Sequence, residues 1–520
     1  MAVPAPAIRN TAPLDSTSTP TTNTVAGARA SLAEVRHAAQ QISTNDLASI
    51  ERLALLEQLR AQALQLLSQQ RLNYIGQALP LAEDERLAWE EQVALWHAFY
   101  FGFALCADIT EPDRAAMVWV RALDSLGRAI REHGRVYRAV PPALWKELNS
   151  CYRTAEACEV HVTAVPAGDI PGAVHTCKQI LLATLLHDAA NLAALSGGQM
   201  RVVERWLLRW VDHADLLADA PAEAARSPLA IRLDGDTGAR RAQNLPKDES
   251  LRYIDTSALG PHLRGLAAAL REQRHHADLA LALGDMPRPD IERLLTHLYV
   301  QWCSAGTGRH EERDESTVRA QVATNLHAIH FQISGRAFRQ PGMRYTREEE
   351  HDLATFGHIT ERTEQRLLTG RSAALEPWEV VNRGVGGSLG LRRKPDLQTR
   401  IGHGQLIAVR TSSAMAPMLG VIQRLRAESD GAMSAGMRLI SGDARGVAVR
   451  IPSSPTPGFE RALLLAADNA RKVPESIIVP TGSYLPGTIL ELHDKRTEKV
   501  QLGEVLERGF EFERLTCERL

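Results

Sequence analysis

Three runs of sequence fix the interpretation of this chain: Arg362-Thr-Glu-Gln-Arg366, Trp378-Glu-Val-Val381 and Asn382-Arg-Gly-Val-Gly-Gly-Ser-Leu-Gly390. Two arginines four positions apart can point at one ligand from a helical turn or from a loop. A guanidinium group pairs with phosphate oxygens or with the O6/N7 edge of guanine. The glycines that follow allow a ligand to approach backbone N–H groups closely. The combination suits a compact guanine ligand with two phosphates.

This pattern resembles the PilZ domain, a bacterial receptor module for cyclic di-GMP built on a small β-barrel. The family signature is RxxxR followed by [D/N]xSxxG. Arg362 and Arg366 match its first part, and Asn382 and Gly387 match its second part. Gly384 stands where the family has serine, so one hydroxyl contact is missing. The resemblance implies a cyclic di-GMP site formed by Arg362, Arg366, Asn382, Arg383, Gly384 and Gly387.

Three runs downstream look like the later strands of the PilZ barrel, in the order found in the family. They are Gly404-Gln-Leu-Ile-Ala-Val-Arg-Thr411, Leu419-Gly-Val-Ile-Gln-Arg-Leu-Arg426 and Gly436-Met-Arg-Leu-Ile440. The expected ligand carries two negative phosphates. Opposite charge would come from the Arg362/Arg366 pair, from Arg383 and from the basic run Arg392-Arg-Lys394.

Length and composition limit the class of protein. The chain has 520 residues, enough for about three domains, and its 44% hydrophobic and 23% charged residues are those of a globular protein. A formal net charge of -2 argues against a DNA-binding protein, which needs a broad basic face. The six cysteines form no CxxC pair and indicate reduced thiols. Neither a signal peptide nor an apolar run long enough for a membrane span is evident, so we expect a cytoplasmic protein.

The periodicity predicts an α+β multidomain protein with a mostly α-helical N-terminal half and a β-rich C-terminal part, which the resemblance implies to be a PilZ-like β-barrel. Residues 1–30 are rich in Thr, Ser, Pro and Ala and indicate a disordered tail. Residues 31–335 show apolar residues at helical spacing, with a possible loop at 221–250. Short β-like runs then favour a connector and barrel at 336–450. We expect residues 451–520 to form additional β structure packed on that barrel.

Other motifs give weaker indications of chemistry. Leu195-Ser-Gly-Gly-Gln199 fits the signature loop of ABC ATPases, but no phosphate-binding GxxxxGK[ST] accompanies it, so its glycines are expected to end a helix. The run 386–390 fits GxSxG, the nucleophile elbow, without the βαβ context that an elbow needs. His327 and His330 form an HxxH pair with no acidic third ligand in frame. We therefore predict no metal, no cofactor and no enzyme activity.

The resemblance thus implies a signalling effector that binds cyclic di-GMP and passes that state to a protein partner or to its own helical half. Motility and biofilm formation are processes compatible with the resemblance. An alternative remains open, in which the barrel is PilZ-like in shape but has lost nucleotide binding and the protein is an interaction scaffold. The glycine at position 384 motivates this alternative, because a polar contact is missing there.

Overall fold

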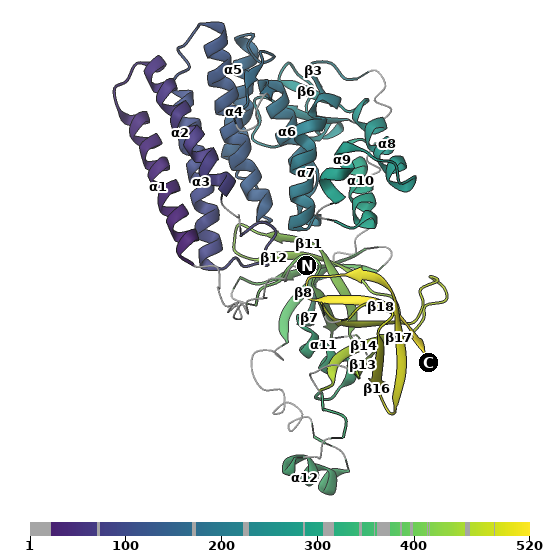
Figure 1. Ribbon diagram of the computed structural model, residues 1–520. Coiled ribbons are helices and arrows are strands. Elements are labelled where there is room, and N and C mark those ends of the chain that lie inside the picture. The colour runs from purple at the N-terminus through teal and green to yellow at the C-terminus, as the bar shows by residue number, and fades with distance from the viewer. Residues whose placement is uncertain are drawn as a thin grey trace, which may run out of the picture.

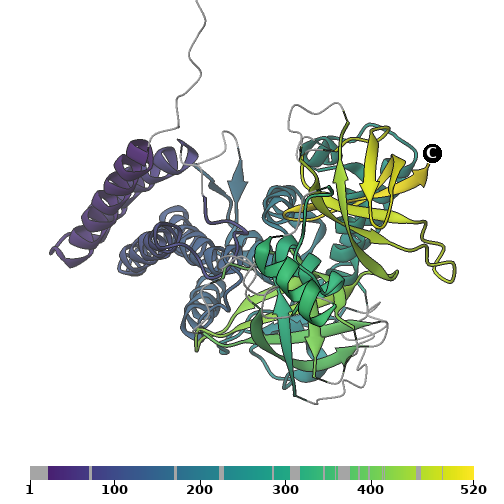
Figure 2. The ribbon, with the colours of Figure 1, turned by 90° about the horizontal axis from the view of Figure 1, so that it is seen from below.

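The computed structural model describes residues 22–520 except for short segments at 70–72, 169–172, 222–227, 284–285, 305–316, 343–345, 358, 361–374, 385–386, 396–398, 413, 415, 453–457 and 483. A helical domain lies above two β-barrels, which sit side by side (Figures 1 and 2). The predicted α+β architecture is confirmed. No helix among the described residues is both long enough and apolar enough to span a bilayer.

The helical domain begins with a bundle of long helices. Its members are α1 (Thr22–Thr44), α2 (Ser49–Gln69), α3 (Glu83–Ala104), α4 (Pro112–Arg135), α5 (Pro142–Ala157), α6 (Cys177–Ala189) and α7 (Gly197–Trp210). Proline stands in the first turn of α4 and of α5, where its missing N–H costs no hydrogen bond. The prediction of a disordered tail at residues 1–30 is wrong for residues 22–30, which belong to α1. Residues 1–21 lie outside the described part of the chain.

A small sheet and three further helices complete this domain. The strands β3 (Asp215–Leu217), β4 (Leu229–Arg232), β5 (Arg240–Arg241) and β6 (Leu251–Asp255) pair in the order β3-β6-β4-β5. The helices are α8 (Leu259–Arg271), α9 (Ala277–Leu283) and α10 (Arg288–Trp302). The loop predicted at 221–250 is therefore wrong in part. The backbone of this polar segment finds its hydrogen bonds in a sheet, which hydrophobic periodicity alone did not indicate.

The first barrel is a closed sheet of six strands. Its members are β7 (Val318–Ala323), β8 (Glu376–Gly384), β9 (Ser388–Arg393), β10 (Leu406–Thr411), β11 (Met418–Ala427) and β12 (Met433–Leu439), in the order β10-β11-β12-β9-β8-β7. The predicted helical region at 31–335 therefore ends too late, because β7 already belongs to the barrel. Two helices separate β7 from β8 in the chain: α11 (Leu326–Ser334) and α12 (Arg347–Phe356). The predicted connector at 336–450 is thus partly helical.

The C-terminal segment forms a second closed barrel. Its strands are β13 (Ala444–Arg450), β14 (Glu460–Leu465), β15 (Ser476–Pro480), β16 (Ile489–His493), β17 (Thr497–Arg508) and β18 (Phe512–Arg519). It has an apolar interior of its own, separate from that of the first barrel. A further apolar cluster, with Ile329 of α11 at 0% exposure, joins the outer faces of the two barrels. The β structure expected at 451–520 is confirmed, but it starts earlier and closes on itself.

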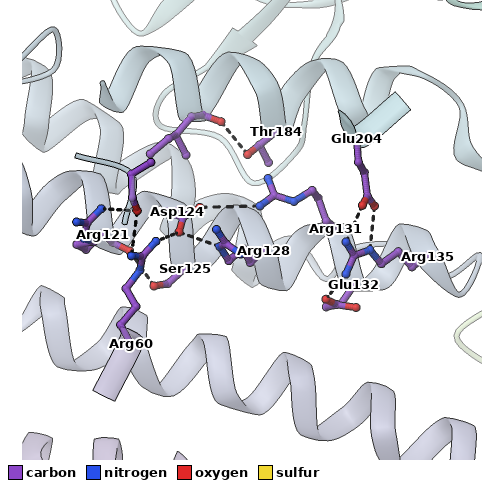
Figure 3. A network of polar contacts seen from close by, with 12 residues as sticks. Arg60, Arg121, Asp124, Ser125, Arg128, Arg131, Glu132, Arg135, Thr184 and Glu204 are labelled. Atoms are coloured by element: carbon purple, nitrogen blue, oxygen red, sulfur yellow. Dashed lines mark hydrogen bonds and ion pairs between the residues drawn. The ribbon is translucent and has the colours of Figure 1, made fainter. Parts of the chain in front are cut away.

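The bundle interior contains an extended network of ion pairs centred on α4 (Figure 3). Arg60 of α2 and Arg128 both contact Asp124, at 2.7 and 2.8 Å. Further along α4, Arg135 binds both carboxylate oxygens of Glu204 on α7, at 2.8 and 2.6 Å. The same guanidinium lies 2.6 Å from Glu132, whose other oxygen accepts a hydrogen bond from Tyr74. These contacts tie α2, α4 and α7 together.

Burial and charge act in opposite directions on these carboxylates. Burial raises the pKa of Glu204, but Arg135 and His187 together outweigh burial and hold that pKa well below its usual range. Burial likewise raises the pKa of Glu132, against the opposing effect of Arg135. A carboxylate whose folded pKa is depressed stabilises the fold above its unfolded pKa and loses that contribution as the pH falls. The Arg135–Glu204 pair therefore stabilises the bundle at neutral pH and not in acid.

We expect Arg135→Met to destabilise the helical domain by about 3–5 kcal/mol at pH 7, because two buried carboxylates lose their cation. The difference from wild type should shrink as the pH falls, because buried glutamates without a cation take up protons already above their ordinary pKa of about 4.3. Denaturant unfolding followed by tryptophan fluorescence measures this, since all of the eight tryptophans except Trp378 lie in the helical domain. Arg86→Met, which breaks the exposed pair with Glu90, is the control and should cost less than about 1 kcal/mol. Equal losses for the two variants would contradict the assignment.

Candidate functional site

A cleft of about 1690 Å³ runs between the helical domain and the two barrels. Its floor is the outer face of β8, β9, β12 and β11 of the first barrel. Its roof comes from the end of α6, the turn before α7, the β4–β5 loop and α10. The end of β17 and the turn after it, in the second barrel, close one side. The volume exceeds the 300–1,000 Å³ of common small-molecule sites, so it accommodates a large polar ligand.

Backbone hydrogen bonds between domains hold the floor against the roof. Leu79, after the second helix, exchanges N–H···O bonds of 2.8 and 2.7 Å with Ile401 of the first barrel. On another side of the cleft, the N–H of Ala427 donates to the carbonyl of Tyr137 at 2.9 Å. His403 contributes a ring nitrogen 3.2 Å from the carbonyl of Ala194. Floor and roof are thus positioned by several separated contacts.

One row of residues crosses the floor from strand to strand. Asn382 on β8 is opposite Gly390 on β9, Gly390 is opposite Gly436 on β12, and Gly436 is opposite Arg424 on β11. All four line the cleft. Three strand spacings of about 4.8 Å make the row roughly 14 Å wide. Two polar side chains therefore border a strip of bare backbone.

The two glycines keep this strip open. A Cβ at position 390 would collide with the side-chain amide of Asn382, and a Cβ at 436 would lie 3.1 Å from the Cβ of Arg424. The side chains of Asn382 and Arg424 therefore lean inward over the glycines. Within the described residues, the Asn382 amide has no hydrogen bond to another group and remains available to a ligand.

A β-bulge lies immediately before the polar residue at each end of the row. The register shifts between Val380 and Asn382 in β8, and between Ile422 and Arg424 in β11. Val380 and Ile422 point into the barrel core, at 1% and 0% exposure. Side chains two apart on a regular strand share a face, so in a strand without the bulge Asn382 would point inward with Val380, and Arg424 with Ile422. Each bulge turns one polar side chain into the cleft.

The glycine turn itself is a β-hairpin. Asn382 and Gly384 lie within β8, two residues or fewer from its end, and therefore precede the turn. Gly387 has a φ of +87°, where only glycine is unstrained. Ser388 is opposite Gly384 across the hairpin, is exposed and lines the cleft. A serine hydroxyl therefore lies beside the position where the PilZ signature has its serine.

The remaining predicted site residues have different positions. Arg362 and Arg366 fall at 361–374 and lie outside the described residues. Arg383 lies on β8 and is exposed, but it is not among the residues that line the cleft. The structure thus brings together Asn382, Gly384 and the hairpin, and leaves the role of the arginine pair a prediction.

The roof contributes a charged group that the sequence did not single out. Asp188 at the end of α6 lines the cleft, and its Oδ2 would lie 2.7 Å from a Cβ at Gly238, so the carboxylate lies against this loop. Burial raises the pKa of Asp188 to about 6, while the charges of Arg240 and Arg426 act in the opposite direction. Arg240 belongs to the roof and Arg426 to the floor, both exposed.

The other sequence motifs have structural roles or no site. Ser196 caps the start of α7 and forms a reciprocal capping box with Gln199, so the glycines of the LSGGQ match begin a helix rather than end one. Ser388 lies on a strand-to-strand hairpin and not on the strand-to-helix turn of a nucleophile elbow. Among the described residues, His, Cys, Asp and Glu nowhere form a group of three with metal-binding geometry.

Several floor residues had a detectable signal in the sequence. Gln423-Arg424-Leu425-Arg426 places two arginines two apart around a buried leucine, as expected for arginines on the outer face of a strand. The row itself had no signal, because the register that joins Gly390 to Gly436 depends on pairing between distant strands. Asp188 had none either, since its position depends on how two domains meet.

The fold and the cleft define a multidomain protein with a large polar cleft between a helical domain and β-barrels. Residues 22–222 match the family model described as "Cyclic-di-GMP receptor FimW, N-terminal domain", and residues 447–520 match "FimW C-terminal beta-barrel domain". The matches occur in chain order and together span more than half of the chain. The chain belongs to the FimW family, a family of cyclic di-GMP receptors.

The matches locate the family's two domains within the fold. The N-terminal model covers α1 to β3, a region for which the sequence had suggested no family. The C-terminal model covers the second barrel. Residues 223–446, which include the first barrel, lie between the two matches, and neither of the two models names the PilZ family. Searches of curated proteins and of solved structures give no significant match.

Proposed function

We propose that this chain binds cyclic di-GMP in the interdomain cleft, and that the first barrel is a PilZ-type barrel whose outer face forms the binding floor. The row Asn382–Gly390–Gly436–Arg424 carries this proposal. It combines an amide, a guanidinium and bare backbone on one surface, which are the groups that recognise guanine and phosphate. Ser388 supplies the hydroxyl that Gly384 lacks.

The chain between Arg366 and β8 is long enough for the Arg366 guanidinium to reach the floor of the cleft. It lies nine residues before Leu375, so the intervening chain spans at most about 30 Å. From Glu376 to Asn382 the strand rises roughly 20 Å. A guanidinium from this segment can therefore meet a ligand held beside Asn382.

The reach of Arg362 toward the cleft is more restricted than that of Arg366. It is two residues beyond Thr360, whose N–H and hydroxyl donate to Asp352 on α12 at 2.9 and 2.7 Å. That helix lies at the end of the molecule opposite the helical domain (Figure 1). It buries two side chains, those of Glu349 and Asp352, and neither is apolar. Little hydrophobic free energy opposes its displacement, so we infer that α12 moves toward the cleft when Arg362 binds.

Ligand binding between domains provides the route to a cytoplasmic signal. A ligand that contacts both floor and roof favours the arrangement in which both are in place, by as much as its affinity differs between arrangements. A protein partner that contacts the helical domain would then sense the bound state. The process controlled, whether motility or biofilm formation, is set by that partner.

We expect the full chain to bind cyclic di-GMP in calorimetry and Arg366→Ala to weaken binding by roughly tenfold to a hundredfold, because one arginine fork is lost. Arg319→Ala removes an exposed arginine from β7 of the same barrel, outside the cleft, and is the matched control. No heat with the wild-type chain at any accessible concentration would favour the scaffold alternative.

We expect Gly390→Ala to weaken cyclic di-GMP binding at least about tenfold with little change in stability, because the added methyl displaces the Asn382 amide from the floor. The residue lies on a strand without positive φ, so alanine fits the backbone. Gly265→Ala, in open space on α8, controls for the substitution itself and should leave affinity unchanged. If Gly390→Ala bound cyclic di-GMP with unchanged affinity, the floor of the cleft would not be part of the binding site.

A further inference from the structure

The roof of the cleft carries a carboxylate without a direct polar partner. Within the described residues, the side chain of Asp188 makes neither a hydrogen bond nor an ion pair shorter than 4 Å. Its nearest charges, Arg240 and Arg426, act on it only through space. The carboxylate is nevertheless held in place, because Gly238 and the ring of Trp145 pack around the same point. A partly buried, positioned acceptor of this kind is expected to serve a donor that arrives with a ligand.

We propose that Asp188 reads the guanine base of the bound dinucleotide, by accepting hydrogen bonds from the N1–H and the N2 amino group of one guanine. This inference rests on the proposed function and adds a specificity determinant from the helical domain. An ionised carboxylate is acceptor-only and matches two adjacent donors. Guanine offers two such donors on its Watson–Crick edge, whereas adenine presents an acceptor at N1.

The geometry of the cleft makes this contact compatible with the floor. Arg426, whose charge acts on Asp188, is two residues from Arg424 on the same face of β11. Side chains two apart on a strand are roughly 7 Å apart. Asp188 on the roof and Arg424 on the floor both line the cleft, and Arg426 lies on the Arg424 side of the floor. A base lying between them would contact Arg424 from below and Asp188 from above.

A purely electrostatic role of Asp188 and a base-reading role predict opposite effects on affinity when this residue is neutralised. The ligand carries two negative charges, so removal of a negative charge from the site should strengthen binding if Asp188 only shapes the potential. If Asp188 accepts from guanine, its replacement by asparagine puts an amide donor against a base donor and weakens binding. The sign of the change therefore separates the two roles.

The test is calorimetric titration of the full chain and of Asp188→Asn with cyclic di-GMP and with cyclic di-AMP. We expect Asp188→Asn to weaken cyclic di-GMP binding by about tenfold to a hundredfold and to narrow the preference over cyclic di-AMP. Asp236→Asn, the same change at an exposed residue of the same cleft, should leave the preference unchanged. Thermal unfolding of each variant verifies that it is folded.

Three other outcomes would each contradict the base-reading role of Asp188, and one of them would also contradict the proposed function. Equal or tighter binding of cyclic di-GMP by Asp188→Asn removes the base-reading role and leaves the proposed function intact. A loss of affinity that is the same for both dinucleotides also removes the base-reading role, since Asp188 would then only support the cleft. Failure of the wild-type chain to bind cyclic di-GMP overturns the proposed function and this inference together.

Discussion

The candidate site depends on two one-residue bulges in an otherwise regular barrel. A β-strand alternates its side chains strictly, and Val380 and Ile422 are committed to the core. Asn382 and Arg424 are each only two residues from an inward side chain, and they reach the outer face because a bulge interrupts the alternation there. The partner residues across the sheet, Gly390 and Gly436, need no such device, since each alternates regularly with buried neighbours. Bulges cost ladder hydrogen bonds, so two at the ends of one row indicate selection for the row.

The helical domain supplies what a barrel alone does not, which is a second wall. A ligand on the outer face of an isolated barrel is open to water on one side, and its hydrogen bonds compete with solvent. The backbone bridges at Leu79–Ile401 and Tyr137–Ala427 hold the α6 end and the turn before α7 over the floor. The ion network around Arg135 makes this roof rigid, because it fixes α4 to α7. Buried charge in the helical domain thereby supports the geometry of the cleft.

The sequence predicted the fold class and the barrel strands because both are local properties. The short apolar runs within Leu406–Thr411 and Met418–Ala427 are visible in adjacent residues of the sequence. Closure of the last six strands into a separate barrel was missed, since closure depends on pairing of β13 with β16. The sheet at β3–β6 was missed because its strands are short and lie in a polar segment.

The candidate site shows the same division between local and non-local information. Asn382, Gly384 and Gly387 follow from a motif, whereas Gly436, Arg424 and Asp188 are joined to them only by register and by domain contact. Asp188 illustrates why the second kind matters for function. A motif on one strand can bind phosphate and stack a base, but discrimination between bases requires an acceptor placed opposite their edge. In the site proposed here that acceptor is Asp188 of the helical domain, so base recognition and contact between the domains would become one event. A receptor built this way reports the identity of its ligand through the same contact that closes the cleft.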